Sequence, residues 1–133
     1  MEKEIITIPG AKRRTLPDGR HEAPLSPGVR AGDFVFVSGQ TPSDPATGAF
    51  VQGDIQVQTR QVLENVKAVL EAGGSSLDKV VKSTVYCANA GHFRAVNEVY
   101  REYFPEDPPA RTFVTVGPWP GSFDIEIECI AID

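Results

Sequence analysis

The chain has 133 residues, a length typical of a single domain. Its 13 Lys and Arg against 18 Asp and Glu leave a net charge of -5, which disfavours nucleic-acid binding because phosphate recognition depends on cationic side chains. No apolar run approaches the roughly 18 residues of a membrane span, and the opening Met1-Glu2-Lys3-Glu4 lacks the pattern of a signal peptide. Only Cys87 and Cys129 are available for disulfides. We therefore expect a cytoplasmic protein that binds neither nucleic acid nor membrane.

The N-terminal quarter combines a short β-prone run with a long stretch rich in glycine and proline. Residues 4–8 favour a strand, whereas residues 9–32 are typical of a loop. The first half of this stretch is basic, with Lys12, Arg13, Arg14 and Arg20. We interpret residues 1–24 as a solvated, partly loop-like arm on a single domain that spans residues 1–133.

Residues 34–38 form a clear strand, which Gly39 ends. Period-2 alternation puts Phe34 and Phe36 on one face, and Val35 and Val37 on the other. A sheet with one face in water would alternate apolar and polar residues instead. We therefore expect both faces of this strand to be covered.

A helix is expected over residues 55–72. Asp54 can cap its N-terminus, and Gly73-Gly74 can end it. Apolar residues recur at helical spacing and form one stripe: Ile55, Val62, Val66, Val69 and Leu70. This stripe predicts that one side of the helix packs on a core.

The second half of the chain alternates strands with one further helix. We expect a strand over 80–88, a helix over 92–104, a strand over 110–116, a turn over 117–121 and a strand over 123–132. Prolines at positions 105, 108 and 109 prevent the helix from continuing. The order of elements indicates an α+β fold, a mixed sheet with two helices packed on one face.

The last strand supports this interpretation through its alternation. The residues on one of its faces suit a core under the helices: Ile125, Ile127, Cys129 and Ala131. Glu126 and Glu128 point the other way, toward the face that carries Phe34 and Phe36. Two helices cannot cover both faces of such a sheet, so a second copy of the chain is the simplest cover.

Two charged residues are candidates for chemistry. Arg111 follows Pro108-Pro109-Ala110 and shares a strand face with Phe113 and Thr115. Such an arginine is often a surface charge, but its planar fork also suits a carboxylate. Glu126 could act as a general acid and base if burial raises its pKa, although alternating glutamates are more often solvated. Asn97, at the edge of an apolar stripe, is ordinarily a boundary residue.

Other kinds of site find no support in the sequence. His21 and His92 show no metal-ligand spacing with either cysteine, so we expect no metal. No glycine-rich phosphate loop precedes a helix, and we expect no nucleotide cofactor. Ser38 has no assignable histidine partner for nucleophilic catalysis.

Six segments, in the same order along the chain, resemble the RidA/YjgF family of reactive intermediate deaminases. They are FVSGQTP at 36–42, QTRQVLENVKAVL at 58–70, VVKSTVY at 80–86, FRAVNEVY at 93–100, PART at 109–112 and IEIECIA at 125–131. No single segment is specific, but the ordered set is, and it extends from about residue 23 to 132.

The resemblance implies a chorismate-mutase-like α+β domain that assembles into a homotrimer, with the sheets around an inner barrel and three sites at the subunit clefts. It implies hydrolysis of 2-aminoacrylate and related imines to 2-keto acids and ammonia, without a cofactor. By motif, Arg111 matches the arginine that grips the substrate carboxylate, and Glu126 matches the glutamate that handles protons. Asn97, Ser38 and Gly39 match positions that line or support the cleft.

The chain departs from the family pattern at three places. Leu25 stands where the family has a tyrosine, and Phe113 stands where it has a cysteine. The loop over 117–121 carries a bulky Trp119. These residues are expected to line the substrate cleft and to change which imino or enamino acid fits.

Three alternatives remain open at this point. A pathway-specific enzyme could act on a larger enamine such as 2-aminomuconate, as some relatives do. A non-catalytic trimer could bind small molecules without turnover. An endoribonuclease activity has been attached to relatives, but the acidic charge balance argues against it. Retention of both Arg111 and Glu126 favours the enzyme over the binder.

Overall fold

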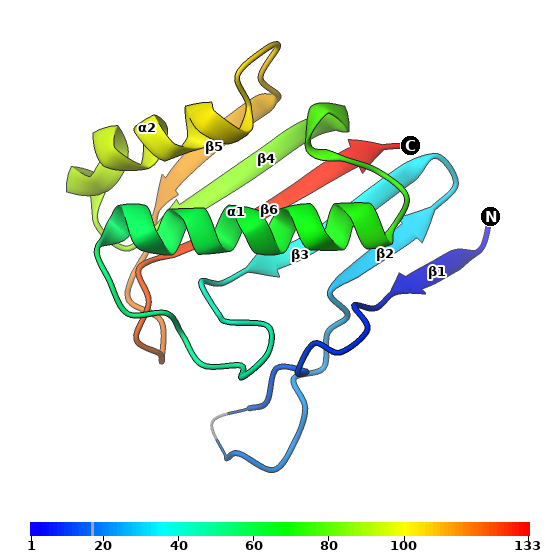
Figure 1. The fold of residues 1–133 in the computed structure, drawn as a ribbon, viewed down its shortest axis with the longest axis horizontal. Helices are drawn as coiled ribbons and strands as arrows, with labels where there is room; N and C mark the ends of the chain where they lie inside the picture. The colour runs from blue at the N-terminus through cyan, green and yellow to red at the C-terminus, as the bar shows by residue number, and fades with distance from the viewer. Residues whose placement is uncertain (17) are drawn as a thin grey trace.

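A computed structural model describes residues 1–16 and 18–133, and over these residues six strands form one sheet with two helices packed against one face (Figure 1). The strands are β1 Lys3–Ile6, β2 Gly28–Ala31, β3 Phe34–Gln40, β4 Val80–Cys87, β5 Ala110–Thr115 and β6 Ile125–Ile132. Their spatial order is β1-β2-β3-β6-β4-β5, in which β4 and β5 pair in parallel and the other neighbours pair antiparallel. The α+β class expected from the sequence is confirmed.

The first helix, α1 Ile55–Ala72, begins and ends where its sequence signals predict. The Asp54 carboxylate accepts a hydrogen bond from the backbone N–H of Val57 at 3.0 Å, which satisfies a free donor of the first turn. Gly73 donates to the carbonyls of Val69 and Leu70 at the other end. The apolar stripe of the helix is buried against the sheet.

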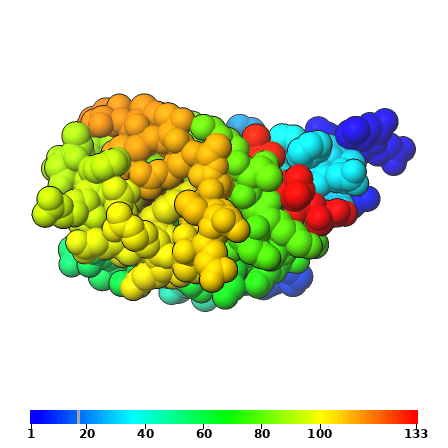
Figure 2. All heavy atoms as spheres, turned by 90° about the horizontal axis from the view of Figure 1, so that it is seen from above, coloured from blue at the N-terminus to red at the C-terminus, as the bar shows by residue number. Residues whose placement is uncertain are grey.

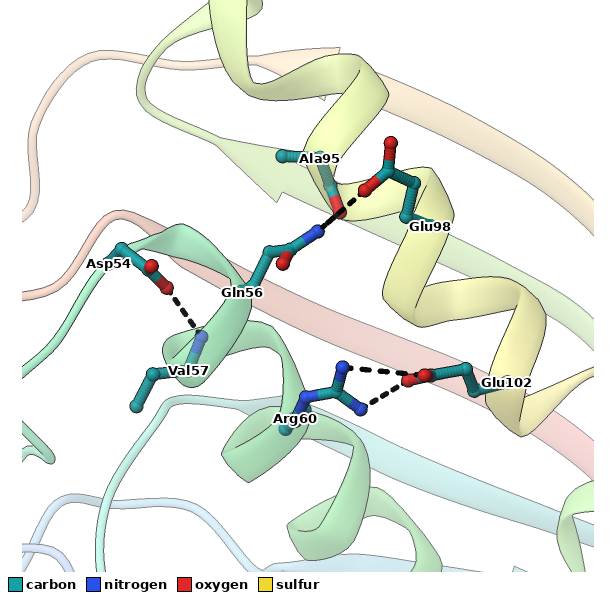
Figure 3. A network of polar contacts seen from close by, with 7 residues as sticks. All are labelled: Asp54, Gln56, Val57, Arg60, Ala95, Glu98 and Glu102. Carbon is teal, nitrogen blue, oxygen red and sulfur yellow. Dashed lines mark hydrogen bonds and ion pairs between the residues drawn. The ribbon is translucent and has the colours of Figure 1, made fainter.

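The second helix, α2 Phe93–Tyr103, follows a short 3-10 turn and ends before the prolines, as expected. Val96, Val99 and Tyr100 are its buried residues. Figure 3 shows that polar side chains also join the two helices: Gln56 donates to Glu98, and Arg60 forms an ion pair with Glu102. These contacts fix α2 beside α1 over the same face of the sheet.

The two faces of the sheet differ as the alternation in the sequence predicts. Val35 and Val37 are buried under α1, together with the inward residues of β6. Phe34, Phe36 and Ile132 lie on the other face and are 45%, 42% and 41% exposed. Within one chain, nothing among the described residues covers this apolar face.

The expected loop over residues 9–32 is wrong in one respect, because β2 lies inside it and pairs with both β1 and β3. Glycines at both ends concealed this short strand. Gly28 is needed there, since a Cβ would come within 2.8 Å of a Val69 methyl group and 2.9 Å of the Phe36 carbonyl. Gly32 has φ +59, which suits the tight turn into β3.

The N-terminal arm folds back on itself as a short hairpin. Thr15 and Glu22 form an antiparallel bridge, and the Leu16 N–H donates to the His21 carbonyl at 2.7 Å. In Figure 1 the tip of this hairpin projects away from the sheet. Pro17, which the sequence places in the arm, lies outside the described residues. No helix within the described ranges is long and apolar enough to cross a membrane.

Candidate active site

Arg111 lies on the helix-covered side of the sheet, at its β5 edge. β5 pairs in register with β4, so that Arg111 is opposite Ser83 and Phe113 is opposite Val85. Ser83 and Val85 are both buried. The guanidinium carbon of Arg111 lies 4.7 Å from the centroid of the Tyr100 ring. Figure 2 views this edge of the molecule, where atoms of α2 in yellow lie beside the orange atoms of β5.

Three aromatic rings surround the guanidinium of Arg111. Besides Tyr100, the rings of Phe93 and Phe113 have centroids 5.8 and 5.9 Å from its central carbon. Phe93 and Phe113 contact each other edge to face, with their centroids 4.9 Å apart. Aromatic faces stabilise a cation without neutralising it, so the charge of Arg111 remains available to an anion.

Tyr100 forms the rigid part of this aromatic frame. Its hydroxyl lies 2.6 Å from the Ser83 hydroxyl in a buried hydrogen bond, and only 6% of its surface is exposed. Burial raises the pKa of Tyr100, although the hydrogen bond with Ser83 and the charge of Arg111 oppose this shift. The phenol therefore stays neutral at physiological pH.

A hollow opens beside the Arg111 guanidinium. It has a volume of about 290 Å³ and is lined by Asn97, Tyr100, Arg101, Phe104, Pro108, Pro109 and Arg111. The Oδ1 atom of Asn97 is buried there without a hydrogen-bond partner among the described residues. No ion pair found over residues 1–16 and 18–133 involves Arg111. The hollow thus presents a cation that no acidic side chain of the described residues neutralises.

Glu126 lies on the opposite face of the sheet. It pairs in register with Tyr86 on β4, whose side chain points away from the helices, and it is half-buried. Its carboxylate lies over Gly39, where a Cβ would come within 2.5 Å of Oε2. Gly39 is therefore required for this close approach rather than for a special backbone angle.

The surroundings of Glu126 shift its proton affinity. Burial raises the pKa of Glu126, the charge of Arg14 lowers it, and the charge of Glu128 raises it further. The net pKa is above the ordinary value of a glutamate. Glu128 itself accepts a hydrogen bond from the Tyr86 hydroxyl. A carboxyl group with a raised pKa is better suited to taking up and releasing protons than an ordinary glutamate.

The remaining residues predicted to line the cleft fall into separate places. The Ser38 hydroxyl donates to the Ser26 carbonyl at 2.6 Å, which joins β3 to the end of the arm. Leu25 is 39% exposed and lines a different hollow, which lies under the arm. Trp119 stacks on Phe123, with centroids 4.8 Å apart, and does not line the hollow at Arg111.

Within one chain, the predicted site residues therefore lie in two separate groups. Arg111 has Asn97 and Phe113 beside it on the helix side of the sheet. Glu126 has Gly39 beside it on the open side. Because the sheet separates the two groups, Arg111 and Glu126 of the same chain cannot contact one small molecule.

The sequence analysis missed two residues around Glu126. Arg14 donates from its guanidinium to the Gly39 carbonyl at 3.2 Å, and Tyr86 is the cross-strand neighbour of Glu126. The only signal for Arg14 in the sequence was a basic run in an apparent loop.

Over residues 1–16 and 18–133, no group of three or more His, Cys, Asp or Glu side chains that could hold a metal ion is found.

Known proteins are similar to most of this chain. A RutC family protein of Pyrococcus horikoshii is 55% identical over 129 residues, which are 97% of this chain and 97% of that protein. Reactive Intermediate Deaminase A, chloroplastic, of Arabidopsis thaliana is 43% identical over 108 residues, which are 81% of this chain and 58% of that protein.

Solved structures of similar proteins superpose on nearly the whole of this chain. A structure from Thermotoga maritima superposes with a TM-score of 0.88 at 45% identity and covers 100% of this chain and 98% of its own. A structure of E. coli TdcF with bound serine superposes with a TM-score of 0.86 at 36% identity, with 98% of each chain covered. The family model described as Endoribonuclease L-PSP matches residues 19–133. The chain therefore belongs to this family, also called RidA/YjgF, as its ordered motifs predict.

Proposed function

We propose that the protein hydrolyses reactive 2-imino and 2-enamino acids to 2-keto acids and ammonia. The observation that carries this proposal is the Arg111 guanidinium, which three aromatic rings surround and with which no acidic side chain of residues 1–16 and 18–133 forms an ion pair. A planar cation of this kind binds a carboxylate through two parallel hydrogen bonds. Two similarities add support, one to a relative named Reactive Intermediate Deaminase A and one to a structure holding serine, which has a carboxylate.

The chemistry requires a carboxylate anchor and one group that transfers protons. Arg111 holds the carboxylate, so that the carbon of the C=N bond faces a water molecule. Glu126 takes a proton from this water as its oxygen bonds to the carbon, and returns a proton to the nitrogen. Glu126 next moves the proton of the new hydroxyl group to the nitrogen, so that the C–N bond breaks, ammonia leaves, and the C=O bond of a keto group forms. The raised pKa of Glu126 suits these successive proton transfers.

The complete site requires two chains, because Arg111 and Glu126 lie on opposite faces of the sheet. We propose that the helix-side edge of one chain, with Arg111, meets the open face of the next chain, with Glu126. Phe34, Phe36 and Ile132 make that open face apolar, as expected for a surface that is buried in an assembly. Repeating this head-to-tail contact three times closes a ring with three equivalent sites.

The test is hydrolysis of imines that an amino-acid oxidase generates in solution. Catalysis is expected to accelerate release of ammonia and keto acid above the spontaneous rate, in proportion to protein concentration. Glu126→Gln serves as the matched control, since it keeps the shape of the site and removes the titrating group. If the parent protein and Glu126→Gln are equally inactive while both bind keto acids, the chain is a small-molecule binder instead.

A further inference from the structure

The N-terminal hairpin holds Arg14 in a fixed place. The Arg14 carbonyl accepts a hydrogen bond from the Ala23 N–H at 2.9 Å, and Ala23 is buried. The turn of the hairpin is held by Asp18, whose side chain accepts from the backbone N–H groups of Arg20 at 2.8 Å and His21 at 3.1 Å. The backbone at Arg14 is therefore anchored on the body of the protein, although the tip of the hairpin projects from it.

The Arg14 side chain reaches the backbone segment against which Glu126 packs. Its guanidinium donates to the Gly39 carbonyl at 3.2 Å. The same glycine lies so close to Glu126 that a Cβ would come within 2.5 Å of Oε2 and 2.7 Å of the carboxylate carbon. Arg14 and Glu126 thus both lie against Gly39, so a movement of Gly39 would displace both side chains.

The charged groups that act on Glu126 come from three elements. Arg14 approaches from the hairpin, and Glu128 lies two residues along β6. Tyr86 lies opposite on β4, but its hydroxyl is engaged with Glu128. Burial and Glu128 both disfavour the ionised form of Glu126, and Arg14 favours it. Among the described residues of one chain, Arg14 is therefore the charged group that opposes neutralisation of this carboxyl.

We propose that Arg14 is a positioning residue for Glu126: it fixes the Gly39 segment beneath the carboxylate and keeps the carboxylate ionised. The inference rests on the proposed function only in giving Glu126 its proton-transfer role. The contact from the hairpin, and its control of the charge state of Glu126, do not depend on which small molecule the site binds. The hairpin then contributes to the reaction without touching the substrate.

An ordinary surface role for Arg14 predicts different behaviour. Arg14 is exposed, so its contact adds little to the free energy of unfolding. A surface charge would leave the titration of Glu126 unchanged, or would change it no more than another arginine of the hairpin does. Arg20 is the matched control, because it lies in the same exposed hairpin and none of the side-chain hydrogen bonds among the described residues uses its guanidinium.

The decisive experiment follows the Glu126 carboxyl by carbon-13 NMR across pH in the full-length protein, with Glu126→Gln to assign the signal. In Arg14→Ala, the titration midpoint is expected to rise by about 0.5 pH unit, as for loss of one partly solvated charge. Arg14→Lys retains the charge and is expected to stay closer to the parent. Arg20→Ala is expected to titrate like the parent.

The kinetic counterpart is the acid limb of kcat/KM, which is expected to move to higher pH in Arg14→Ala by the same amount as the midpoint. A midpoint in Arg14→Ala equal to that in Arg20→Ala would overturn the inference. The NMR titration needs no turnover. Absence of imine hydrolysis in the parent protein would thus count against the proposed function alone, while the titration still decides the role of Arg14.

Discussion

The guanidinium of Arg111 lies over the ring of Tyr100, 4.7 Å from its centroid, and this ring belongs to the buried core. A buried hydrogen bond to Ser83 fixes the rotation of the ring. The orientation of the proposed carboxylate anchor is thus set by core packing on β4 and α2. Preorganisation of this kind lowers the entropy lost when a substrate binds.

Arg111→Ala is expected to lower kcat/KM for 2-iminopropionate at least about tenfold, which corresponds to about 1.4 kcal/mol of lost transition-state stabilisation. The partner for the substrate carboxylate is removed, while the ring of Tyr100 remains anchored to Ser83. Arg111→Lys is expected to restore little, because an ammonium cannot supply two parallel donors. Light scattering on both variants checks that the assembly persists. Full activity in Arg111→Ala would make the arginine a surface charge.

Gly39→Ala is expected to displace the Glu126 carboxylate and to lower turnover. The added methyl group would overlap the end of the Glu126 side chain, which can rotate away at little cost to the fold. Thermal unfolding should therefore change much less than kcat. A variant with unchanged kcat would show that the position of Glu126 over Gly39 is not needed for turnover.

Glu126→Gln is expected to reduce turnover strongly while the substrate still binds, because the amide keeps the shape but cannot titrate. In the parent protein, activity should fall as pH drops through the raised pKa of Glu126, since the carboxylate form is needed to accept a proton from water. The kcat and KM of the two proteins, measured separately across pH, check both statements. Unchanged turnover would leave Glu126 a structural residue.

The same residue gives a prediction for stability. A carboxyl whose folded-state pKa lies above its unfolded-state pKa contributes stability below the unfolded value, and this contribution is lost as pH rises through the folded value. Burial puts Glu126 in this class. At neutral pH, Glu126→Gln is therefore expected to be at least as resistant to urea as the parent protein. The comparison is made at one protein concentration, because assembly also stabilises the fold.

Long helices and strands were predictable because several sequence signals within each of them indicate the same structure. At α1, the cap Asp54, the apolar stripe and Gly73 all agree with one another. At β6, alternation alone identified which residues are buried and that Glu126 faces the other way. By contrast, β2 is four residues long and is held by its neighbours on both sides, so its own sequence carries little signal.

The arrangement of the candidate site was less accessible from the sequence. Alternation placed Arg111 with Phe113, which is confirmed. It could not reveal that Arg111 and Glu126 lie on opposite faces, since this depends on β6 lying between β3 and β4. Contacts such as Arg14 with Gly39 depend on the path of the hairpin, which brings together residues 25 positions apart. The assembly expected from the sequence remains a prediction.

That assembly is expected to be a trimer. Light scattering at micromolar concentration should give about three times the 14.4 kDa chain mass. Phe36→Glu should shift the protein toward monomer, because it places a charge on the apolar open face. Imine hydrolysis should fall in parallel, since each proposed site needs two chains. A monodisperse parent monomer would contradict both the trimer and the shared site.

Substrate preference is expected to favour apolar imino acids. Phe93 and Phe113 present apolar rings beside Arg111, and Phe113 replaces the small thiol of the family pattern. Arg30, on β2, is paired with Asp133 and donates to the Gly73 carbonyl. On the side of Arg111 that Phe93 and Phe113 form, a second charge on the substrate would therefore lose water without gaining a partner.

Imines derived from Leu, Met or Phe should accordingly have kcat/KM values about tenfold or more above those from Asp or Glu, with 2-aminoacrylate between them. Phe113→Cys restores the thiol and is expected to narrow this difference, because it removes the ring but leaves Arg111 and Tyr100 in place. A panel of oxidase-generated imines, compared by kcat/KM at one pH, measures both effects. If Phe113 instead fills the site, 2-aminoacrylate alone would react and Phe113→Cys would admit the larger imines. A clear preference for acidic imines or for 2-aminomuconate would indicate that Arg101, which also lines the hollow, binds the additional carboxylate, and it would contradict the apolar character assigned to the site.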